Sequence, residues 1–237
     1  LVTTYAQHNE LVALCDLSTV RMAFYNERLR RLGHAPVPAY TAERFDELLR
    51  TERPDEVFVC TQDSTHHDYI VRALHAGCDV ITEKPMTTDA AKCRAVLDAV
   101  AATGKRVRVA FNYRWAPFRT KVKELIVAGT IGRVHSVNLE YLLDTHHGAD
   151  YFRRWHRNMR SSGGLLVHKA THHFDIANWW IGEEPETVYA HAARRFYGDD
   201  RMAGHGKRCL GCPLAADCDF AWDIRSNDEA VALYQRN

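Results

Sequence analysis

A glutamate and a lysine stand side by side directly after a short apolar run. The run is DVIT at 79–82, and Glu83, Lys84 and Pro85 follow it. Short apolar runs between helical segments are typical of buried strands, and ligands bind beyond the carboxyl ends of parallel strands. Lysine can orient and polarise a bound group, so we expect Lys84 to be catalytic and Glu83 to lie beside a ligand. The alternative is a surface turn that carries a weak ion pair.

Two histidines, His168 and His172, lie four residues apart at the start of an expected helix. This spacing would keep both imidazoles on one helical face. Histidine is the side chain best matched to proton transfer at neutral pH, so the pair predicts acid/base chemistry. Two alternatives stay open: hydrogen-bonded structural histidines, and a metal pair. A metal would need a third ligand, which could come from His146, His147 or His156.

Four arginines alternate with aromatic residues and a histidine between residues 151 and 160. One interpretation is a solvated basic loop. The other is a substrate site, in which rings stack on a sugar while guanidinium groups bind a carboxylate or phosphate through paired hydrogen bonds. The residues expected to bind substrate are Arg154, Trp155 and His156 in this segment, and Tyr113, Arg114 and Lys169 outside it.

The segment HGKRCLGCPLAADC, at 205–218, contains ligand types that zinc prefers. Cys209 and Cys212 form a C-x2-C pair, His205 precedes them by four residues, and Cys218 follows. Zinc binding is one interpretation, but free thiols are favoured, and no metal is predicted. The other cysteines lie in apolar or helical context, where cysteine behaves as a small hydrophobe, so we expect a reducing, cytoplasmic location.

Composition narrows the classes of partner. The 237 residues are 46% hydrophobic, and 31 basic residues balance 30 acidic ones, for a net charge of +1. This balance argues against nucleic acid as a partner and favours a small ligand. The sequence contains no apolar stretch near the roughly 20 residues of a membrane-spanning helix, so no membrane partner is expected.

The first half alternates short apolar runs with amphipathic segments, which predicts βα units that build a parallel sheet in an α/β fold. Parallel strands would bring Asp16, Thr61 with Gln62, Glu83 with Lys84, and Asn112 to one crevice. The expected strands are 11–15, 56–60, 79–82 and 106–111. The expected helices are 18–32, a segment capped by Ser64 that ends at Gly77, and 88–103.

Asp16 ends the first of these strands. In a dinucleotide-binding fold an acid at this place bonds the ribose hydroxyls, and a glycine-rich phosphate loop lies about 20 residues earlier. The sequence has no G-x-G-x-x-G before Asp16 and begins with Leu1. We therefore expect a fragment that lacks the first strand and the glycine loop. Alternatively, Asp16 only stabilises the N-terminus of the next helix.

The character of the sequence changes after Asn112. A helix over 117–128, a long strand over 134–143, the helix that bears the histidines, and a final strand at 230–234 indicate a second domain that is also cut short. We expect a dinucleotide-binding domain at 1–112 and a substrate and oligomerisation domain at 113–237.

Four ordered motifs resemble the Gfo/Idh/MocA family of NAD(P)-dependent oxidoreductases: EKP after a strand, NYRW from Asn112, AGTIG from Ala128, and SGG before a helix that carries histidine. The resemblance spans residues 16 to about 180. It implies a Rossmann domain followed by an α/β domain whose open-faced, largely antiparallel sheet covers the nicotinamide and often mediates oligomerisation.

The resemblance also implies roles for individual residues. Asp16 matches the ribose-binding acid, Thr61 and Gln62 the turn that contacts the dinucleotide, and Lys84 the lysine between nicotinamide and substrate. His172 matches the family's acid/base histidine, whereas His168 stands where the family carries an aspartate. The resemblance thus implies His172 as the base and His168 as its helper. The full set expected to bind cofactor is Asp16, Thr61, Gln62, His66, Glu83, Lys84 and Asn112.

The expected activity is hydride transfer between a nicotinamide cofactor and a sugar, polyol or uronate-like substrate. NAD(H) is preferred and NADP(H) remains possible, because the Asp16 carboxylate would repel a 2′-phosphate while Arg21 lies nearby. A homo-oligomer, dimer or tetramer, is expected. Two alternatives stay open: an NAD-dependent enzyme that cleaves glycosides through transient oxidation, and a non-catalytic, nucleotide-sensing or zinc-stabilised module.

Overall fold

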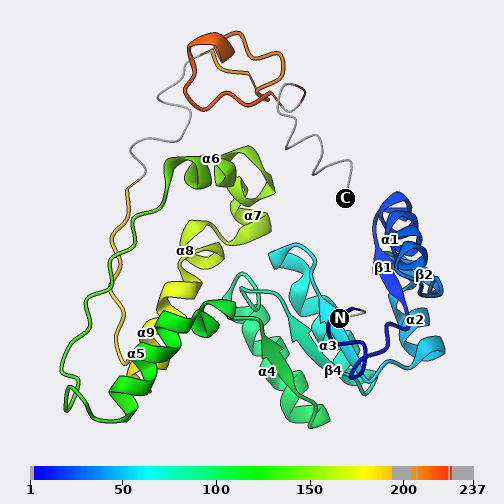
Figure 1. Cartoon of the computed structure of the whole chain (residues 1–237), viewed down its shortest axis with the longest axis horizontal. Coiled ribbons are helices and arrows are strands. Elements are labelled where there is room, and N and C mark those ends of the chain that lie inside the picture. The colour runs from blue at the N-terminus through cyan, green and yellow to red at the C-terminus, as the bar shows by residue number, and fades with distance from the viewer. Residues whose placement is uncertain (1–2, 194–203, 207, 224, 226–237) are drawn as a thin grey trace.

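The computed structural model describes residues 3–193, 204–206, 208–223 and 225 of the chain. In Figure 1 the strands and their flanking helices form the lower and right-hand parts, and a group of helices from the later sequence lies beside them. The strand expected at 230–234 lies outside the described residues. None of the described helices combines the length and apolarity needed to cross a membrane.

The first βα unit forms as expected. Strand β1 (Leu14–Asp16) pairs in parallel with β2 (Ala39–Thr41), and helix α1 (Thr19–Arg31) connects them. The hydroxyl of Ser18 accepts the Arg21 N–H at 3.2 Å, which satisfies one of the free amides at the helix start. Local capping by Ser18, two residues after the end of β1, therefore fixes where α1 begins.

A three-stranded parallel sheet follows. Strand β4 (Asp79–Thr82) lies between β3 (Glu56–Val59) and β5 (Val107–Val109). Helix α3 (His66–His75) connects β3 to β4, and α4 (Ala90–Thr103) connects β4 to β5. The two connections run the chain back so that all three strands point the same way, and their carboxyl ends meet at one edge.

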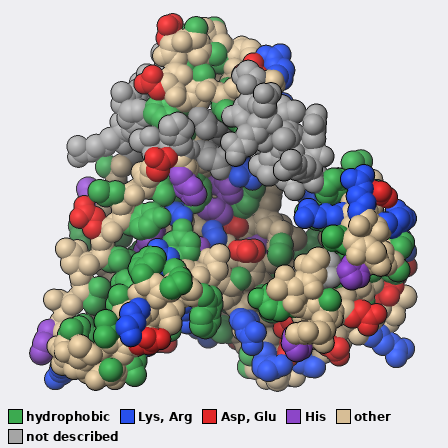
Figure 2. All heavy atoms as spheres, in the orientation of Figure 1, with side chains coloured by type: hydrophobic (Ala, Val, Ile, Leu, Met, Phe, Trp, Pro, Cys, Tyr) green, Lys and Arg blue, Asp and Glu red, His purple; other side chains and the backbone are tan. Residues whose placement is uncertain are grey.

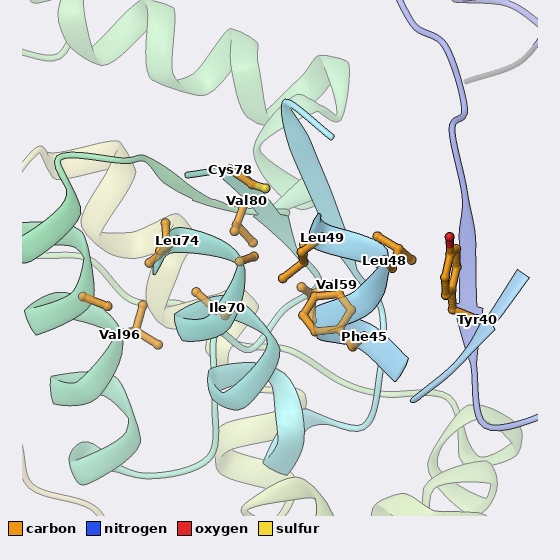
Figure 3. Packing of buried hydrophobic residues seen from close by; sticks show 12 residues of the cluster. Tyr40, Phe45, Leu48, Leu49, Val59, Ile70, Leu74, Cys78, Val80 and Val96 are labelled. Atoms are coloured by element: carbon orange, nitrogen blue, oxygen red, sulfur yellow. The ribbon is translucent and has the colours of Figure 1, made fainter. Parts of the chain in front are cut away.

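The main core lies between this sheet and the helices α2 (Phe45–Glu52), α3 and α4. Ile70 and Leu74 on α3 have no exposed surface, and Val80 on β4 and Val96 on α4 are each 1% exposed. Figure 3 shows these side chains converging between the helices and the strands. Burial of this size contributes roughly 1.5–3 kcal/mol for each large aliphatic side chain, so the core holds the strand ends in place.

Strands β1 and β2 form a sheet of their own, and β1 does not pair with β3. In a doubly wound sheet one more strand would lie between them.

The later described residues form helices joined by long segments without regular secondary structure. Helix α5 (Pro117–Val127) follows a short 3-10 turn, η3 (Asn112–Trp115), and packs on α9 (Thr171–Ile181), where the Trp180 indole N–H donates to the Arg119 carbonyl at 3.0 Å. The remaining elements are α6 (Thr145–Arg153), η4 (Trp155–Arg157), α7 (Met159–Ser162), α8 (Leu165–His168) and η5 (Ala215–Asp217).

The strand prediction for 134–143 is wrong. The segment is extended but pairs with no other strand in the described part of the chain, and Leu139, Tyr141 and Leu142 are exposed. The alternating apolar residues suit a strand, but a strand needs hydrogen-bonding neighbours to form a sheet.

The expectation that His168 and His172 share one helix is also wrong. The Ala170 N–H bonds to the Leu165 carbonyl, five residues back, and the His172 N–H to the Lys169 carbonyl, three residues back. The hydrogen-bond ladder changes between these residues, so the chain forms two helices, α8 and α9. His168 ends the first and His172 lies in the first turn of the second.

Candidate functional site

Polar side chains follow the carboxyl ends of the strands, as expected from the sequence. At the end of β1 the Asp16 carboxylate accepts the Ser18 N–H at 2.8 Å and two hydrogen bonds from the Arg21 guanidinium at 3.0 and 3.1 Å. Arg21 is 60% exposed, so this ion pair contributes little to stability. Asp16 keeps part of its surface open to solvent, where a ribose could approach.

The turn after β3 exposes the predicted cofactor residues Thr61 and Gln62. The Thr65 hydroxyl donates to the Gln62 carbonyl at 2.8 Å and lies 2.9 Å from the Thr61 hydroxyl, which closes the turn before α3. Glu83, after β4, and Asn112, after β5, are exposed at the same edge of the sheet. Their exposed polar groups fit contact with a dinucleotide, and this role stays a prediction.

His66, by contrast, is buried rather than exposed to a ligand. Its side chain has no accessible surface, and its two ring nitrogens lie 2.9 Å from the Pro85 carbonyl and 3.0 Å from the Thr61 carbonyl. The expectation that His66 touches the cofactor is therefore corrected. This histidine ties the loop after β3 to the loop after β4, and so holds the residues that face the site.

Lys84 reaches from the end of β4 to the helical half. Its ammonium donates to the carbonyl oxygen of His168 at 2.9 Å, across 84 positions of sequence. Burial lowers the pKa of Lys84, while Asp63 and Glu83 oppose that effect. The predicted catalytic lysine and the predicted helper histidine are thus in contact.

Asp63, which the sequence interpretation missed, pairs with His168. Its carboxylate lies 2.5 Å from Nδ1 of His168, and the two residues are 3% and 7% exposed. Asp63 begins a 3-10 turn directly after the exposed Thr61 and Gln62. Asp63 lies four residues beyond the end of β3, and no motif in the sequence singled it out.

His172 lies in a different environment. It is 4% exposed, and its ring stacks face to face on Tyr113, with centroids 3.8 Å apart. Burial, together with the charges of Lys84 and Lys169, lowers the pKa of His172 to about 3. Its Nδ1 is buried without a hydrogen-bond partner. A ligand hydroxyl or amide would satisfy that nitrogen, which supports a binding site here.

Lys169 and Tyr113 form a second polar contact, as the Lys169 ammonium donates to the Tyr113 hydroxyl at 2.7 Å. Burial opposes ionisation of Tyr113, but hydrogen bonds with Lys169 and Tyr141 outweigh burial and lower its pKa. Lys169 is itself 7% exposed. Both residues were expected to bind substrate, and the structure places them beside His172.

Arg114 does not line this site with a free guanidinium. It makes a bidentate pair with Asp175, whose side chain is 6% exposed, and it lies over the rings of Phe111 and Trp179. Nε and Nη2 of Arg114 bond to Asp175 and so join η3 to α9, and a role for Arg114 in substrate binding stays a prediction.

The segment from residue 151 to 160 contributes rings to the site. His156 and Trp155 pack on His168, with ring centroids 4.4 and 5.5 Å away. Arg154 is exposed. In Figure 2 histidine side chains gather near the middle of the face shown, around α6 and α7. The structure thus brings Trp155 and His156 to the candidate site.

A metal site is not formed by the residues that the structure describes. No three histidine, cysteine, aspartate or glutamate side chains within them could hold an ion together. Cys209, Cys212 and Cys218 are free thiols, and Sγ of Cys212 accepts the Gly206 N–H at 3.2 Å.

Comparisons with known proteins agree with this geometry. Residues 1–111 match the model of an oxidoreductase family with an NAD-binding Rossmann fold, and residues 123–234 match the model of the C-terminal alpha/beta domain of that family. YteT of Bacillus subtilis (strain 168), which is described only in general terms as an oxidoreductase, is 42% identical over 98% of this chain.

Two other similar proteins are dehydrogenases of small polyols or sugars. Inositol 2-dehydrogenase of Rhizobium meliloti (strain 1021) is 37% identical over 59% of this chain and 40% of its own length. A levoglucosan dehydrogenase, solved with NADH and levoglucosan, is 28% identical over 73% of this chain and 45% of its own, with a TM-score of 0.59. The chain spans 55% of the length of YteT.

Proposed function

Because this chain belongs to the Gfo/Idh/MocA family of oxidoreductases, we propose that it is an NAD(P)-dependent dehydrogenase that oxidises a CH–OH group of a sugar, polyol or uronate-like substrate. The observation that carries the proposal is the contact between Lys84, at the end of β4, and His168, on the opposite helical segment. It places the lysine ammonium against the backbone carbonyl of a histidine at the edge where a dinucleotide would bind.

The residues present fit a nicotinamide dinucleotide. Asp16 offers a carboxylate to ribose hydroxyls, and the exposed turn at Thr61 and Gln62 lies next along the same edge. When bound, the cofactor supplies a hydride acceptor. NAD is the preferred form, because the Asp16 carboxylate would repel a 2′-phosphate. Arg21, which already pairs with Asp16, could instead turn toward such a phosphate, so NADP remains usable.

Oxidation of a carbinol also requires removal of the hydroxyl proton. Lys84 would hold and polarise the hydroxyl, and an imidazole of the pair His168 and His172 would receive the proton. The wall beside them offers Tyr113 and Lys169 on one side and Trp155 with His156 on the other. Rings of this kind stack on the apolar faces of sugars, while Lys169 and Arg154 could hold a hydroxyl or a carboxylate.

The remaining expectations belong to the same proposal. We place the boundary between the dinucleotide-binding and substrate domains at 112/113. The second domain would use the family's open-faced sheet to cover the nicotinamide and to form a dimer or tetramer. The match of residues 123–234 to the model of a C-terminal alpha/beta domain supports this arrangement. A cytoplasmic location is proposed with it.

The test is an activity screen with the full chain. NAD⁺ or NADP⁺ would be mixed with inositols, aldoses, levoglucosan and hexuronates, and reduced nicotinamide would be followed by absorbance. We expect reduction with at least one substrate, and faster reduction of NAD⁺ than of NADP⁺. Cleavage of a glycoside without net reduction would show the redox-neutral alternative. Tight NAD⁺ binding with no reaction on any substrate would favour a nucleotide-sensing module.

A further inference from the structure

Asp63 and His168 form a buried contact between the two halves of the chain. Asp63 begins the turn after β3, and His168 ends α8, 105 positions later. The carboxylate oxygen lies 2.5 Å from Nδ1 of His168, and both side chains are more than nine-tenths buried. A carboxylate and an imidazole in this arrangement act on each other more strongly than they would in water.

The contact determines which ring nitrogen of His168 carries a proton. A carboxylate can only accept a hydrogen bond, so Nδ1 must donate. In the neutral ring this leaves a lone pair on Nε2, and an added proton at Nε2 would give an imidazolium that Asp63 stabilises. The same division of labour between a carboxylate and a histidine operates in Ser-His-Asp hydrolases.

His172 lacks such a partner. Its Nδ1 has no hydrogen bond, its ring stacks on Tyr113, and two ammonium groups lie close enough to affect its ionisation. Burial and those charges lower the pKa of His172 to about 3, so a proton would be held weakly there. Of the two histidines, only His168 has a carboxylate bonded to its ring, and that carboxylate would stabilise a proton accepted by the imidazole.

His168 also lies beside the other groups of the candidate site. Its carbonyl oxygen accepts the Lys84 ammonium at 2.9 Å, and its ring packs against His156 and Trp155. The backbone of His168 therefore helps to place the lysine, while its side chain is held by Asp63. A displacement of the Asp63 side chain would therefore move both the His168 ring and the Lys84 ammonium.

We propose that Asp63 and His168 act as one carboxylate–imidazole couple, in which Asp63 is the positioning residue and His168, rather than His172, receives the hydroxyl proton of the substrate. The inference rests on the proposed dehydrogenase function. The carbinol C–H bond breaks and its hydride passes to the nicotinamide, while the O–H proton passes to Nε2 of His168. The carbon–oxygen bond becomes a carbonyl, and the imidazolium then loses its proton to solvent.

The first test reads the tautomer directly and needs no activity. The protein would be labelled with ¹⁵N in its histidine rings, and the His168 signals would be assigned by their loss in His168→Gln. We expect His168 to be protonated at Nδ1 in the wild-type protein, and this preference to disappear in Asp63→Ala. A His168 ring that carries its proton on Nε2, or that is unaffected by Asp63→Ala, overturns the couple.

The second test is kinetic. Asp63→Asn keeps an oxygen that can accept the hydrogen bond but removes the charge, so kcat should fall at least about tenfold while KM for NAD⁺ changes little. His168→Gln should lower kcat more than His172→Gln does. Asp46→Asn, which removes an exposed carboxylate of α2 paired with Arg72 of α3, is the matched control and should keep wild-type kcat.

Exchanging Asp63 and His168 distinguishes a carboxylate–imidazole couple from a purely structural role of either residue. His168→Asp alone restores the residue type that the family carries at this position. It also places two carboxylates face to face, so its kcat should be lower than that of the wild-type protein. Combining His168→Asp with Asp63→His re-creates an opposite pair and should recover at least about tenfold in kcat over either single change.

The outcomes distinguish the two proposals. If the wild-type protein reduces neither nucleotide with any substrate, the dehydrogenase assignment and the proton-acceptor role fail together, while the tautomer measurement still decides whether the couple exists. If the wild-type protein is active but His172→Gln is the more damaging change, the function stands and the choice of His168 is wrong. If the exchange gives no recovery, Asp63 is not a positioning residue.

Discussion

The imidazole of His172 lies face to face with the phenol ring of Tyr113, with ring centroids 3.8 Å apart and planes 6° from parallel. The contact buries His172 in the first turn of α9 and leaves its Nδ1 without a partner. A protonated imidazole would be poorly accommodated there, because Lys84 and Lys169 already place positive charge nearby. The folded protein therefore keeps this histidine neutral over the physiological range.

This neutrality predicts an acid-sensitive stability. In the unfolded chain His172 would bind a proton below about pH 6.5, whereas in the folded protein its pKa is about 3. The unfolded state thus binds more protons, and stability falls as pH drops from about 6.5 toward 3, by about 2 kcal/mol between pH 7 and 5. Urea unfolding at the two pH values would measure this loss.

The matched variants are His172→Gln and His34→Gln. His172→Gln should reduce the loss of stability between pH 7 and 5 by about 2 kcal/mol, whatever its effect at pH 7 alone. His34→Gln removes an exposed imidazole and should keep the wild-type slope. An identical slope in wild-type protein and His172→Gln would show that His172 is protonated in the fold.

Tyr113 should lose its proton at a lower pH than an ordinary tyrosine, because Lys169 donates a hydrogen bond to its hydroxyl. The ammonium of Lys169 donates to the phenol oxygen at 2.7 Å, and this bond helps to lower the pKa of Tyr113. Lys169→Met should therefore raise the pH at which one tyrosine titrates, as followed by ultraviolet difference absorbance. Tyr113→Phe should delete the same early transition. If the early transition persists in Lys169→Met, another residue is responsible for it.

Much of the first half could be predicted from the sequence because its signals are local. Ser18 before α1, Asp89 before α4 and Gly104 after α4 each act on the adjacent turn of helix, and the structure places the boundaries there within two residues. Gly104 has φ of +67°, a left-handed conformation that glycine adopts without strain. The short helix α2 was not predicted, although it buries Phe45, Leu48 and Leu49 on one face.

The candidate site was predicted only in part, because its decisive contacts are long-range. The motifs grouped Lys84, His168 and His172, and the structure places the Lys84 ammonium against the His168 carbonyl. The bond from Asp63 to His168 spans 105 positions, and no spacing rule indicates it. The break between α8 and α9 could not be foreseen either, since VHKATHHFD contains neither proline nor glycine. The pairing of Arg114 with Asp175 was likewise not predicted, because the two residues lie 61 positions apart.

Asp16 should control the choice between NAD and NADP. Asp16→Ser removes the carboxylate that would accept ribose hydroxyls and repel a 2′-phosphate, and it frees Arg21 from its ion pair. We expect weaker binding of NAD⁺ and a higher affinity for NADP⁺ relative to NAD⁺, as measured by calorimetric titration of both. An unchanged ratio, with lower thermal stability, would mean that Asp16 only orders the start of α1 through the Ser18 amide.

Lys84→Met should abolish most turnover without unfolding the protein. The methionine keeps the apolar stem. The lost ammonium donates to the His168 carbonyl at 2.9 Å, in a place where burial already lowers the pKa of the lysine. Removing a half-buried charge should leave stability close to wild type, whereas loss of a group that holds the reacting hydroxyl should lower kcat at least about a hundredfold.

Lys92→Met is the matched control for that change. Lys92 lies in the first turn of α4, where its ammonium bonds to Thr88 and Asp89 rather than to the site, so the variant should keep wild-type kcat. Steady-state kinetics and thermal unfolding would be measured for both variants at one pH. A folded Lys84→Met protein with near-normal kcat would remove Lys84 from the catalytic machinery and leave it only the task of joining β4 to α8.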